Sequence, residues 1–240
     1  MMPAKGSRKA RPDTQAVDGE DVEVLLGGFG GQGIILSGLI LGKAASLFSD
    51  KRATFTQSYG PEARGGACSA NVMISDGEID YPYVTRPHHM MVMSQGAYEK
   101  YVDRLRGGGN LLYDEDLVEL KFRRDDIDRF GVPATRLAEG LGRKIVANIV
   151  MLGFVAAVTQ VVDYDAMKSA ILDTVPPGTE ELNLKAYNKL SKTYKAILER
   201  GAQAAALKGM AFWEGESGRA IERFVKAGSA IVPLPKEELV

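Results

Sequence analysis

Apolar positions follow two periods along the chain, one typical of strands and one typical of helices. The run Val22–Leu26 is short and apolar, Gly27–Gly33 is rich in glycine, and Ile34–Phe48 carries apolar residues three and four positions apart. A short apolar run indicates a strand, and the longer spacing indicates a helix. These residues therefore predict a strand, a glycine loop and a helix in that order.

The two patterns recur through residue 200. Apolar or alternating runs predict strands at Ala53–Gln57, Ala67–Ser75, Glu78–Tyr81, His88–Met93, Asn110–Tyr113 and Val132–Thr135. Asp76-Gly77 is a dipeptide typical of hairpin turns. Helical spacing covers Ala97–Leu105, Lys144–Val162, Tyr164–Asp173 and Glu180–Arg200. This order predicts an α/β fold with a Rossmann-like, mostly parallel sheet and an antiparallel hairpin excursion.

The composition changes at both ends of this pattern. Residues 1–21 are polar and charged, which predicts a disordered N-terminal tail. Residues 22–200 carry the α/β pattern, and residues 201–240 are rich in alanine and glycine. We expect the last segment to form a helical C-terminal arm that is separate from the sheet.

One uncharged stretch, Ile145–Val162, reaches the lower length limit of a membrane span. Arg143, Lys144 and Asp163 bound it closely, and it contains Asn148. A buried or subunit-facing helix is therefore expected rather than a span. The N-terminus lacks the apolar core of a secretory signal, so a cytoplasmic protein is predicted.

Composition and charge exclude several classes of function. The 30 basic and 31 acidic residues give a net charge of −1, which offers no general field for nucleic acid or an anionic membrane. A single cysteine, Cys68, excludes a disulfide framework, a structural zinc site and a self-contained iron–sulfur cluster. His88 and His89 are adjacent on a predicted strand, so they face opposite sides and cannot chelate one metal together.

The glycine loop is the first candidate site. Gly28-Phe29-Gly30-Gly31-Gln32-Gly33 fits G-x-G-x-x-G between a predicted strand and helix. Glycines there let a phosphate approach the free amides of the helix start. The second strand ends in Thr56-Gln57-Ser58 without the acidic residue of a nicotinamide site, and no P-loop lysine follows. The alternative is a tight packing turn without a ligand.

A second loop, Ser58–Gly66, follows the second predicted strand. In a doubly wound sheet it lies at the same carboxyl edge as the glycine loop. Arg64 offers a planar set of donors for phosphate or carboxylate, Tyr59 offers a flat face or a hydroxyl, and Glu62 can orient Arg64. The alternative is an exposed ion pair of little energetic value.

Together these stretches resemble the γ subunits of 2-oxoacid:ferredoxin oxidoreductases, over roughly Val22 to Leu198. The resemblance is carried by five stretches: Gly27–Gly33, Gln57–Gly66, Asn71–Asp76, Asn148–Gly153 and Glu181–Ala186. Among them Gln57-Ser58-Tyr59-Gly60-Pro61-Glu62-Ala63-Arg64-Gly65-Gly66 is the most specific, because a Rossmann-like fold alone does not require it.

The resemblance implies a complex that oxidatively decarboxylates a 2-oxoacid to an acyl-CoA. Thiamine diphosphate, Mg and the iron–sulfur clusters are expected on the α, β and ferredoxin-like δ partner subunits, with ferredoxin as electron acceptor. Coenzyme A is a substrate, and 2-oxoglutarate is preferred over pyruvate as the 2-oxoacid. This chain is expected to bind no cofactor alone, to contact no nucleic acid or membrane, and to hold no catalytic residue.

The resemblance and the anion-binding physics together predict that the chain shapes the CoA side of the site. The candidate residues are Gly28, Gly30, Gly31, Gln32, Gly33, Ser58, Tyr59, Glu62, Arg64 and Gly65. Two other interpretations stay open at this point. One is a stand-alone Rossmann-like nucleotide-binding oxidoreductase, and the other is a scaffold that serves only assembly.

Overall fold

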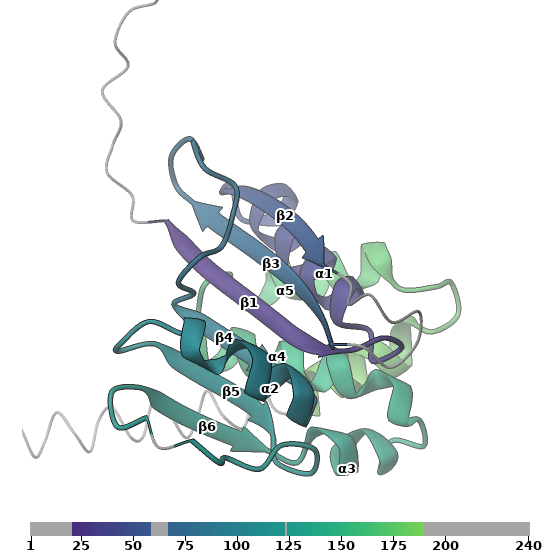
Figure 1. Ribbon diagram of the computed structural model, residues 1–240. Helices are drawn as coiled ribbons and strands as arrows, with labels where there is room; N and C mark the ends of the chain where they lie inside the picture. The colour runs from purple at the N-terminus through teal and green to yellow at the C-terminus, as the bar shows by residue number, and fades with distance from the viewer. Residues whose placement is uncertain (1–20, 59–66, 123, 190–240) are drawn as a thin grey trace, which may run out of the picture. The chain divides into compact units, whose positions relative to one another are not determined.

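Strand β1 (Val22–Phe29) lies in the interior of a six-stranded sheet with the order β2-β3-β1-β4-β5-β6 (Figure 1). The computed structural model describes residues 21–58, 67–122 and 124–189. The predicted arm 201–240 and the predicted tail, except for residue 21, lie outside these ranges.

Most elements fall close to their predicted ranges, and two of them, α1 and β3, match to the residue. The other strands are β2 (Arg52–Ser58), β3 (Ala67–Ser75), β4 (His89–Val92), β5 (Asn110–Asp114) and β6 (Asp128–Val132). The helices are α1 (Ile34–Phe48), α2 (Gln95–Tyr101), α3 (Ala134–Glu139), α4 (Ala147–Thr159) and α5 (Tyr164–Thr174). Single 3₁₀ turns cover Val102–Arg104 and Lys144–Val146, and residues 180–189 are also helical.

The sheet is mostly parallel, as predicted. β4 runs parallel to β1, β5 to β4 and β6 to β5, whereas β3 runs antiparallel to both of its neighbours, β1 and β2. β2 consequently points in the same direction as β1. The α/β class with one antiparallel excursion is therefore confirmed.

The hairpin predicted at Asp76-Gly77 is wrong. Residues 78–81 form no strand, and the turn is instead closed by the N–H of Gly77, which donates to Ser75 Oγ at 3.0 Å. The reason is that β1 and β2 already occupy both sides of β3, in registers such as Val22 with Ile74 and Arg52 with Ser75. No free edge of β3 remains for a hairpin partner.

The strand predicted at Val132–Thr135 is displaced. β6 ends at Val132, and Thr135 lies in α3. Pro133 separates the two elements, and its lack of an N–H stops the ladder of sheet hydrogen bonds. The chain therefore turns into a helix where continued alternation was expected.

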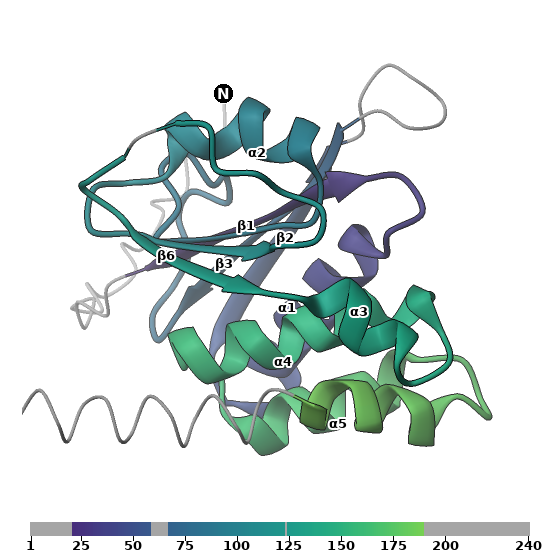
Figure 2. The ribbon, with the colours of Figure 1, turned by 90° about the horizontal axis from the view of Figure 1, so that it is seen from below.

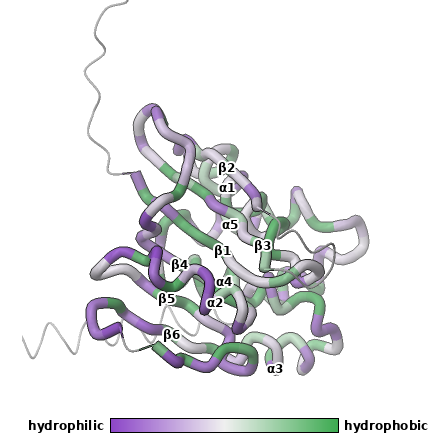
Figure 3. The backbone as a smooth tube through the Cα atoms, viewed as in Figure 1, coloured by the Kyte–Doolittle hydropathy of each residue, from purple (hydrophilic) through white to green (hydrophobic). Residues whose placement is uncertain are grey.

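The helices form layers on the two faces of the sheet. Figure 2 shows α2 on one face and α1, α4 and α5 on the other. A core cluster beneath α2 joins strand residues such as Leu25 and Met90 to Ala97 and Tyr98 of the helix. Hydrophobic residues predominate in the strand interior, and hydrophilic ones gather in the loops beside β5 and β6 (Figure 3).

The uncharged stretch is a buried helix, as expected. Residues 147–157 of α4 are all buried, and the helix ends at Thr159, before the cap residue Gln160, whose backbone is left-handed with φ 51°. In the part of the chain that the structure describes, no helix is long and apolar enough to cross a bilayer.

Candidate functional site: the glycine turn and its cavity

The turn between β1 and α1 is shorter than the predicted glycine loop. β1 continues through Gly27 and Gly28 to Phe29, so residues 30–33 alone form the turn. Gly31 and Gly33 have left-handed backbones, with φ of 99° and 76°. Gly33 caps α1 without a side-chain hydrogen bond, and the first helical bond runs from Ser37 N–H to the Gly33 carbonyl at 2.9 Å. The amides before Ser37 point out of the helix toward the carboxyl edge.

The four motif glycines divide into two pairs with different roles. A Cβ atom on Gly28 would lie 2.6 Å from Gln32 Oε1, and one on Gly33 would lie 2.5 Å from Asn148 Nδ2. A Cβ on Gly30 or Gly31 would meet no atom within 4 Å. The interpretation as a packing turn therefore fits Gly28 and Gly33, whereas Gly30 and Gly31 leave the backbone open on its outer side.

Gln32 fixes the turn to the end of β4. Its Oε1 accepts a hydrogen bond from Phe29 N–H at 2.9 Å, and its Nε2 donates to the Met93 carbonyl at 2.6 Å. The Gln32 amide thus has a structural part in addition to the predicted ligand contact. The ligand contact itself stays a prediction.

Asn148 of α4 supports the same turn from the other side, and sequence reasoning assigned it no role in the site. The side chain is buried, and its Nδ2 donates to the Gly33 carbonyl at 3.3 Å and to Ser37 Oγ at 3.4 Å. The available signal was a lone amide within an uncharged, buried stretch, because a buried polar group has to be paired.

A cavity of about 360 Å³ opens beside the turn, at the carboxyl ends of β1 and β4. It is lined by Phe29, Gly31, Gln32, Met93, Leu117, Thr135, Lys144, Ile145 and Ala147. Helix α1 follows β1 on one face of the sheet, and α2 follows β4 on the other (Figure 2). Open α/β sheets bind ligands in the crevice where the connections diverge in this way. Of these nine lining residues, only Gly31 and Gln32 were predicted as site residues, and the other seven were not.

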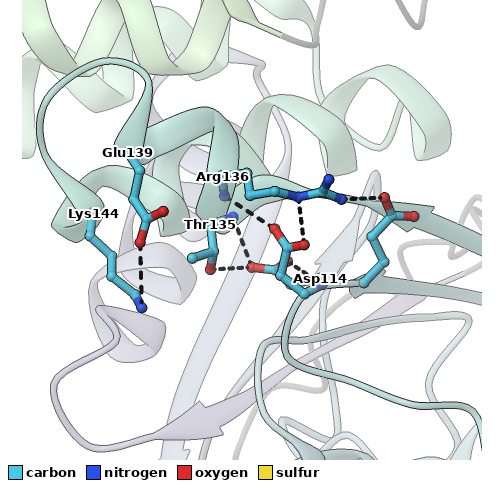
Figure 4. A network of polar contacts seen from close by, with 7 residues as sticks. Asp114, Thr135, Arg136, Glu139 and Lys144 are labelled. Atoms are coloured by element: carbon cyan, nitrogen blue, oxygen red, sulfur yellow. Dashed lines mark hydrogen bonds and ion pairs between the residues drawn. The ribbon is translucent and has the colours of Figure 1, made fainter.

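Asp114, at the end of β5, anchors the helix that borders this cavity (Figure 4). Its side chain is fully buried, and Oδ2 accepts from Thr135 N–H at 3.0 Å and from Thr135 Oγ1 at 2.7 Å. Burial raises the pKa of Asp114, against the opposing effect of the hydrogen bonds from Thr135 and from Asp116 N–H. The carboxylate holds α3 in place and fixes the position of Thr135.

The charged groups around α3 are paired to different degrees. Arg136 forms ion pairs with Asp116 at 2.6 Å and with Glu115 at 3.2 Å. Lys144 lies 3.7 Å from Glu139, and the two side chains are 65% and 52% exposed (Figure 4). Lys144 is therefore a loosely paired cation on the cavity wall.

The second predicted loop is only partly within the described residues. Ser58 ends β2 and is exposed, and its register through Ser69 to Gly27 places it at the same sheet edge as the glycine turn. The route differs from the predicted one, because β2 reaches this edge with β3 between it and β1. The remaining predicted residues, which lie outside the described residues, are Tyr59, Glu62, Arg64 and Gly65.

The histidines and the cysteine lie away from the cavity lining. His88 Nδ1 accepts from Glu23 N–H at 3.1 Å, and His89 lies in β4, where burial and then the neighbouring His88 lower its pKa to about 4. Cys68 is buried in β3, and burial raises the pKa of its thiol. Within residues 21–58, 67–122 and 124–189, no group of three or more His, Cys, Asp or Glu could hold a metal ion.

Comparison with known proteins matches this architecture to one family. Residues 23–190 fit the sequence profile of the family Pyruvate ferredoxin/flavodoxin oxidoreductase. The 2-oxoglutarate synthase subunit KorC of Methanocaldococcus jannaschii is 53% identical over 169 residues, which cover 70% of this chain and 90% of that subunit.

Two solved structures share the fold. The gamma subunit of a keto/oxoacid ferredoxin oxidoreductase from Geobacter sulfurreducens PCA aligns with a TM-score of 0.67 at 40% identity, over 74% of this chain and 98% of that one. The 2-oxoglutarate:ferredoxin oxidoreductase from Magnetococcus marinus, solved with 2-oxoglutarate, coenzyme A and succinyl-CoA bound, aligns at 0.64 and 21% identity, over 74% and 31% of the two chains. The resemblance inferred from the glycine and Gln57–Gly66 stretches is thus confirmed, and this chain belongs to the pyruvate ferredoxin/flavodoxin oxidoreductase family.

Proposed function

We propose that this chain is the γ subunit of a 2-oxoglutarate:ferredoxin oxidoreductase and that it shapes the CoA side of the active site. The family membership and the 53% identity to a 2-oxoglutarate synthase subunit support the assignment. Its partners are then the α, β and ferredoxin-like δ subunits, with ferredoxin as the electron acceptor in the cytoplasm. Thiamine diphosphate, Mg and the iron–sulfur clusters belong to those partners.

The observation that carries the CoA role is the open backbone at Gly30 and Gly31. No atom would obstruct a Cβ within 4 Å of either residue, so a phosphate can approach this backbone closely. The free amides at the start of α1 and the positive end of its dipole face the same side. Lys144 adds a positive charge on the cavity wall. The contacts of Ser58, Tyr59, Glu62, Arg64 and Gly65 with the same anion stay a prediction from the sequence.

A stand-alone nicotinamide enzyme is the less favoured function. In a dinucleotide site, the acidic residue that binds the ribose ends a parallel strand beside β1. Here the neighbour of β1 on that side is β3, which is antiparallel, and β2 lies one strand further away. The sheet therefore lacks the parallel strand beside β1 whose terminal acidic residue usually binds the adenine ribose of NAD.

The assembly and substrate are tested on the tagged chain isolated with its partner subunits. We expect CoA-dependent reduction of viologen with 2-oxoglutarate, at a kcat/KM well above those for pyruvate and for branched-chain 2-oxoacids. A complex that is active on pyruvate but not on 2-oxoglutarate would contradict the substrate. A lone chain that binds NAD would contradict the whole assignment.

The CoA role is tested by Arg64→Ala in that complex. Loss of a phosphate-binding guanidinium should raise the KM for CoA about tenfold or more and leave the KM for 2-oxoglutarate unchanged. Arg52→Ala is the matched control, because Arg52 is an exposed arginine at the opposite end of β2. An unchanged KM for CoA in Arg64→Ala would contradict this role.

A further inference from the structure

The two outer strands of the sheet differ in how well they are protected against pairing with another chain. β6 has five residues, begins with Asp128 and Arg129, and is followed by Pro133. Short length, charged side chains and proline are features by which proteins block an outer strand. β2 has seven residues, and its only charged side chain is Arg52 at the first position. Residues 53–58 of β2 therefore carry none of these protections.

The outer side of β2 faces away from the sheet. In the part of the chain that the structure describes, β3 is the only strand that pairs with β2, and Figure 1 shows β2 as the outermost strand beside α1. Residues 53–56 are all partly exposed although they form the middle of the strand. An outer strand of this kind presents a row of backbone N–H and C=O groups that pairs readily with a further strand.

Helix α1 presents an apolar surface beside the same strand. Phe55 packs against α1 at two glycines, because a Cβ atom on Gly38 would lie 2.8 Å from its ring and one on Gly42 would lie 3.9 Å from its Cβ. Leu39 directly follows Gly38, so a turn of about 100° carries its side chain away from the sheet, and it is 38% exposed. Ile35, one helical turn earlier, is partly exposed. We call strand β2 together with Ile35 and Leu39 the β2–α1 surface.

The geometry of the β2–α1 surface suits a second copy of this chain. Two β2 strands that pair in antiparallel fashion are related by a twofold axis perpendicular to the sheet, so both copies of α1 lie on the same face. Helix α1 packs on β2 and β3, and neighbouring strands are about 4.8 Å apart, so the two β3 strands would lie about 14 Å apart. A helix with its side chains is about 10–12 Å wide, so the Leu39 side chains of the two copies can meet across this gap.

The charges are compatible with such a pair. Antiparallel pairing places the two Arg52 side chains at opposite ends of the interface and sets Thr54 opposite Thr56 of the second copy. Lys43, the only charged residue of α1, forms an ion pair with Asp173 of α5 at 2.9 Å. β2 and α1 therefore bring no unpaired like charges together.

We propose that the β2–α1 surface binds a second copy of this chain, through antiparallel β2–β2 pairing centred on Phe55 that joins the two six-stranded sheets. Phe55 is the middle residue of β2, so this register uses the whole strand. A strand from another protein would pair with β2 alone, whereas a second copy also covers Leu39 with the same apolar surface. The β2–α1 surface contains none of the residues that line the cavity at the glycine turn, so the inference does not depend on the CoA role.

The oligomeric state of the full chain tests this surface. Analytical ultracentrifugation over a range of concentrations should show a dimer. Leu39→Lys and Thr56→Lys each place a charge in the interface and should raise the Kd of the dimer about tenfold or more. Phe122→Lys is the matched control and should leave the dimer intact, because Phe122 is 46% exposed but contacts Tyr98 of α2. Circular dichroism establishes that each variant is folded.

Disulfide crosslinking tests the register. Thr54→Cys and Thr56→Cys lie opposite each other across the twofold axis, so a mixture of the two variants should form a crosslinked dimer under mild oxidation after subunit exchange. Either variant alone brings its two cysteines only to diagonal positions, about 7–8 Å apart, which disfavours a bridge. The native Cys68 is buried, so the wild-type chain should give no crosslink.

Four outcomes overturn the inference. They are a wild-type chain that sediments as a monomer throughout, a dimer that both lysine variants leave unchanged, and a mixture that crosslinks no better than either cysteine variant alone. The fourth concerns the purified complex, in which a photocrosslinker attached to Thr56→Cys should capture a second copy of this chain. Capture of a different subunit instead would assign the β2–α1 surface to that subunit. None of these outcomes alters the expected KM for CoA in Arg64→Ala, so a failure here is distinct from a failure of the proposed function.

Discussion

The two edges of the sheet hold hollows that are lined by different kinds of groups. At the carboxyl edge, glycine backbone and apolar side chains surround the 360 Å³ cavity. At the amino edge, a hollow of about 500 Å³ is lined mainly by charged and polar groups: Glu23, Thr85, Arg86, His88, Arg106 and Gly107. The number of charged side chains alone would favour the amino edge as the binding site. The hydrogen bonds of those side chains favour the carboxyl edge instead.

At the amino edge, Glu23 and His88 hold a loop in place. Glu23 Oε2 accepts from the N–H groups of Thr85 at 2.7 Å and Arg86 at 2.9 Å, and the Glu23 N–H donates to His88 Nδ1. Arg106 contacts the other ring nitrogen of His88. α1 also ends near this edge, and the C-terminal end of a helix repels anions. Glu23 and His88 are thus hydrogen-bonded within the protein, whereas the backbone at Gly30 and Gly31 is open on its outer side.

The packed glycines of the carboxyl edge should tolerate substitution least. Gly33→Ala should destabilise the protein by about 3 kcal/mol, because it forces an L-residue into a left-handed backbone and places Cβ 2.5 Å from Asn148 Nδ2. Chemical denaturation measures the change. Gly30→Ala is the control, since its Cβ has open space, and its cost should stay below about 0.5 kcal/mol. Equal losses in the two variants would refute the division of the motif into packing and open glycines.

Asp114→Ala should cost about 2 kcal/mol, because it leaves the buried N–H and hydroxyl of Thr135 without their acceptor. Asp114→Asn removes the ionisable group and tests whether ionisation of Asp114 contributes to the pH dependence of stability. The raised pKa means that the folded state binds a proton more readily than the unfolded chain, so wild-type stability falls as pH rises from 3.8 through the raised value. The stability difference between wild type and Asp114→Asn should therefore narrow with rising pH. Urea titrations at several pH values would show it, and a widening difference would contradict the assigned cause.

The amino edge should respond to pH with the opposite sign. His89 has its pKa lowered from 6.5 to about 4, so the unfolded chain takes up a proton between these values and the folded chain does not. Stability is then lost as pH falls from 6.5 toward 4, on the order of 1 kcal/mol by pH 5 after allowance for the half-buried ring. His89→Gln should remove this acid sensitivity. If the free energy of unfolding of His89→Gln fell with pH as steeply as that of the wild type, the acid sensitivity would belong to another group.

Local sequence patterns predicted most of the fold, and the failure of the predicted hairpin has a non-local cause. Helix α1 and strand β3 follow from uninterrupted periodicity bounded by turn residues. Asp76-Gly77 has the right chemistry for a hairpin, yet pairing depends on which edges are free, and β1 and β2 occupy both edges of β3. The dipeptide Asp76-Gly77 by itself carries no information about whether an edge of β3 is free.

The candidate site also has a part that the sequence predicts and a part that depends on non-local packing. The glycine turn is visible in the sequence because its requirement is local and steric. The residues that complete it, Asn148 and Lys144, lie more than a hundred positions away and reach it only through the packing of α4 and the turn before it. Of the two, Asn148 leaves a sequence signal, a lone amide among apolar residues, whereas an exposed lysine such as Lys144 leaves none.

Glu23→Gln should have the smallest effect on stability, and it tests the difference between the two edges. Glu23→Gln keeps an oxygen that can accept from Thr85 and Arg86 but removes the charge, so the stability loss should be about 0.5 kcal/mol. Because Glu23 holds the loop and lies outside the proposed CoA site, the KM for CoA should stay unchanged in the same complex. Lys144→Gln makes an equally small change of one charge at the carboxyl edge, and there the KM should rise while stability is unaffected. A KM that rises in Glu23→Gln would move the anion site to the amino edge and reverse the comparison.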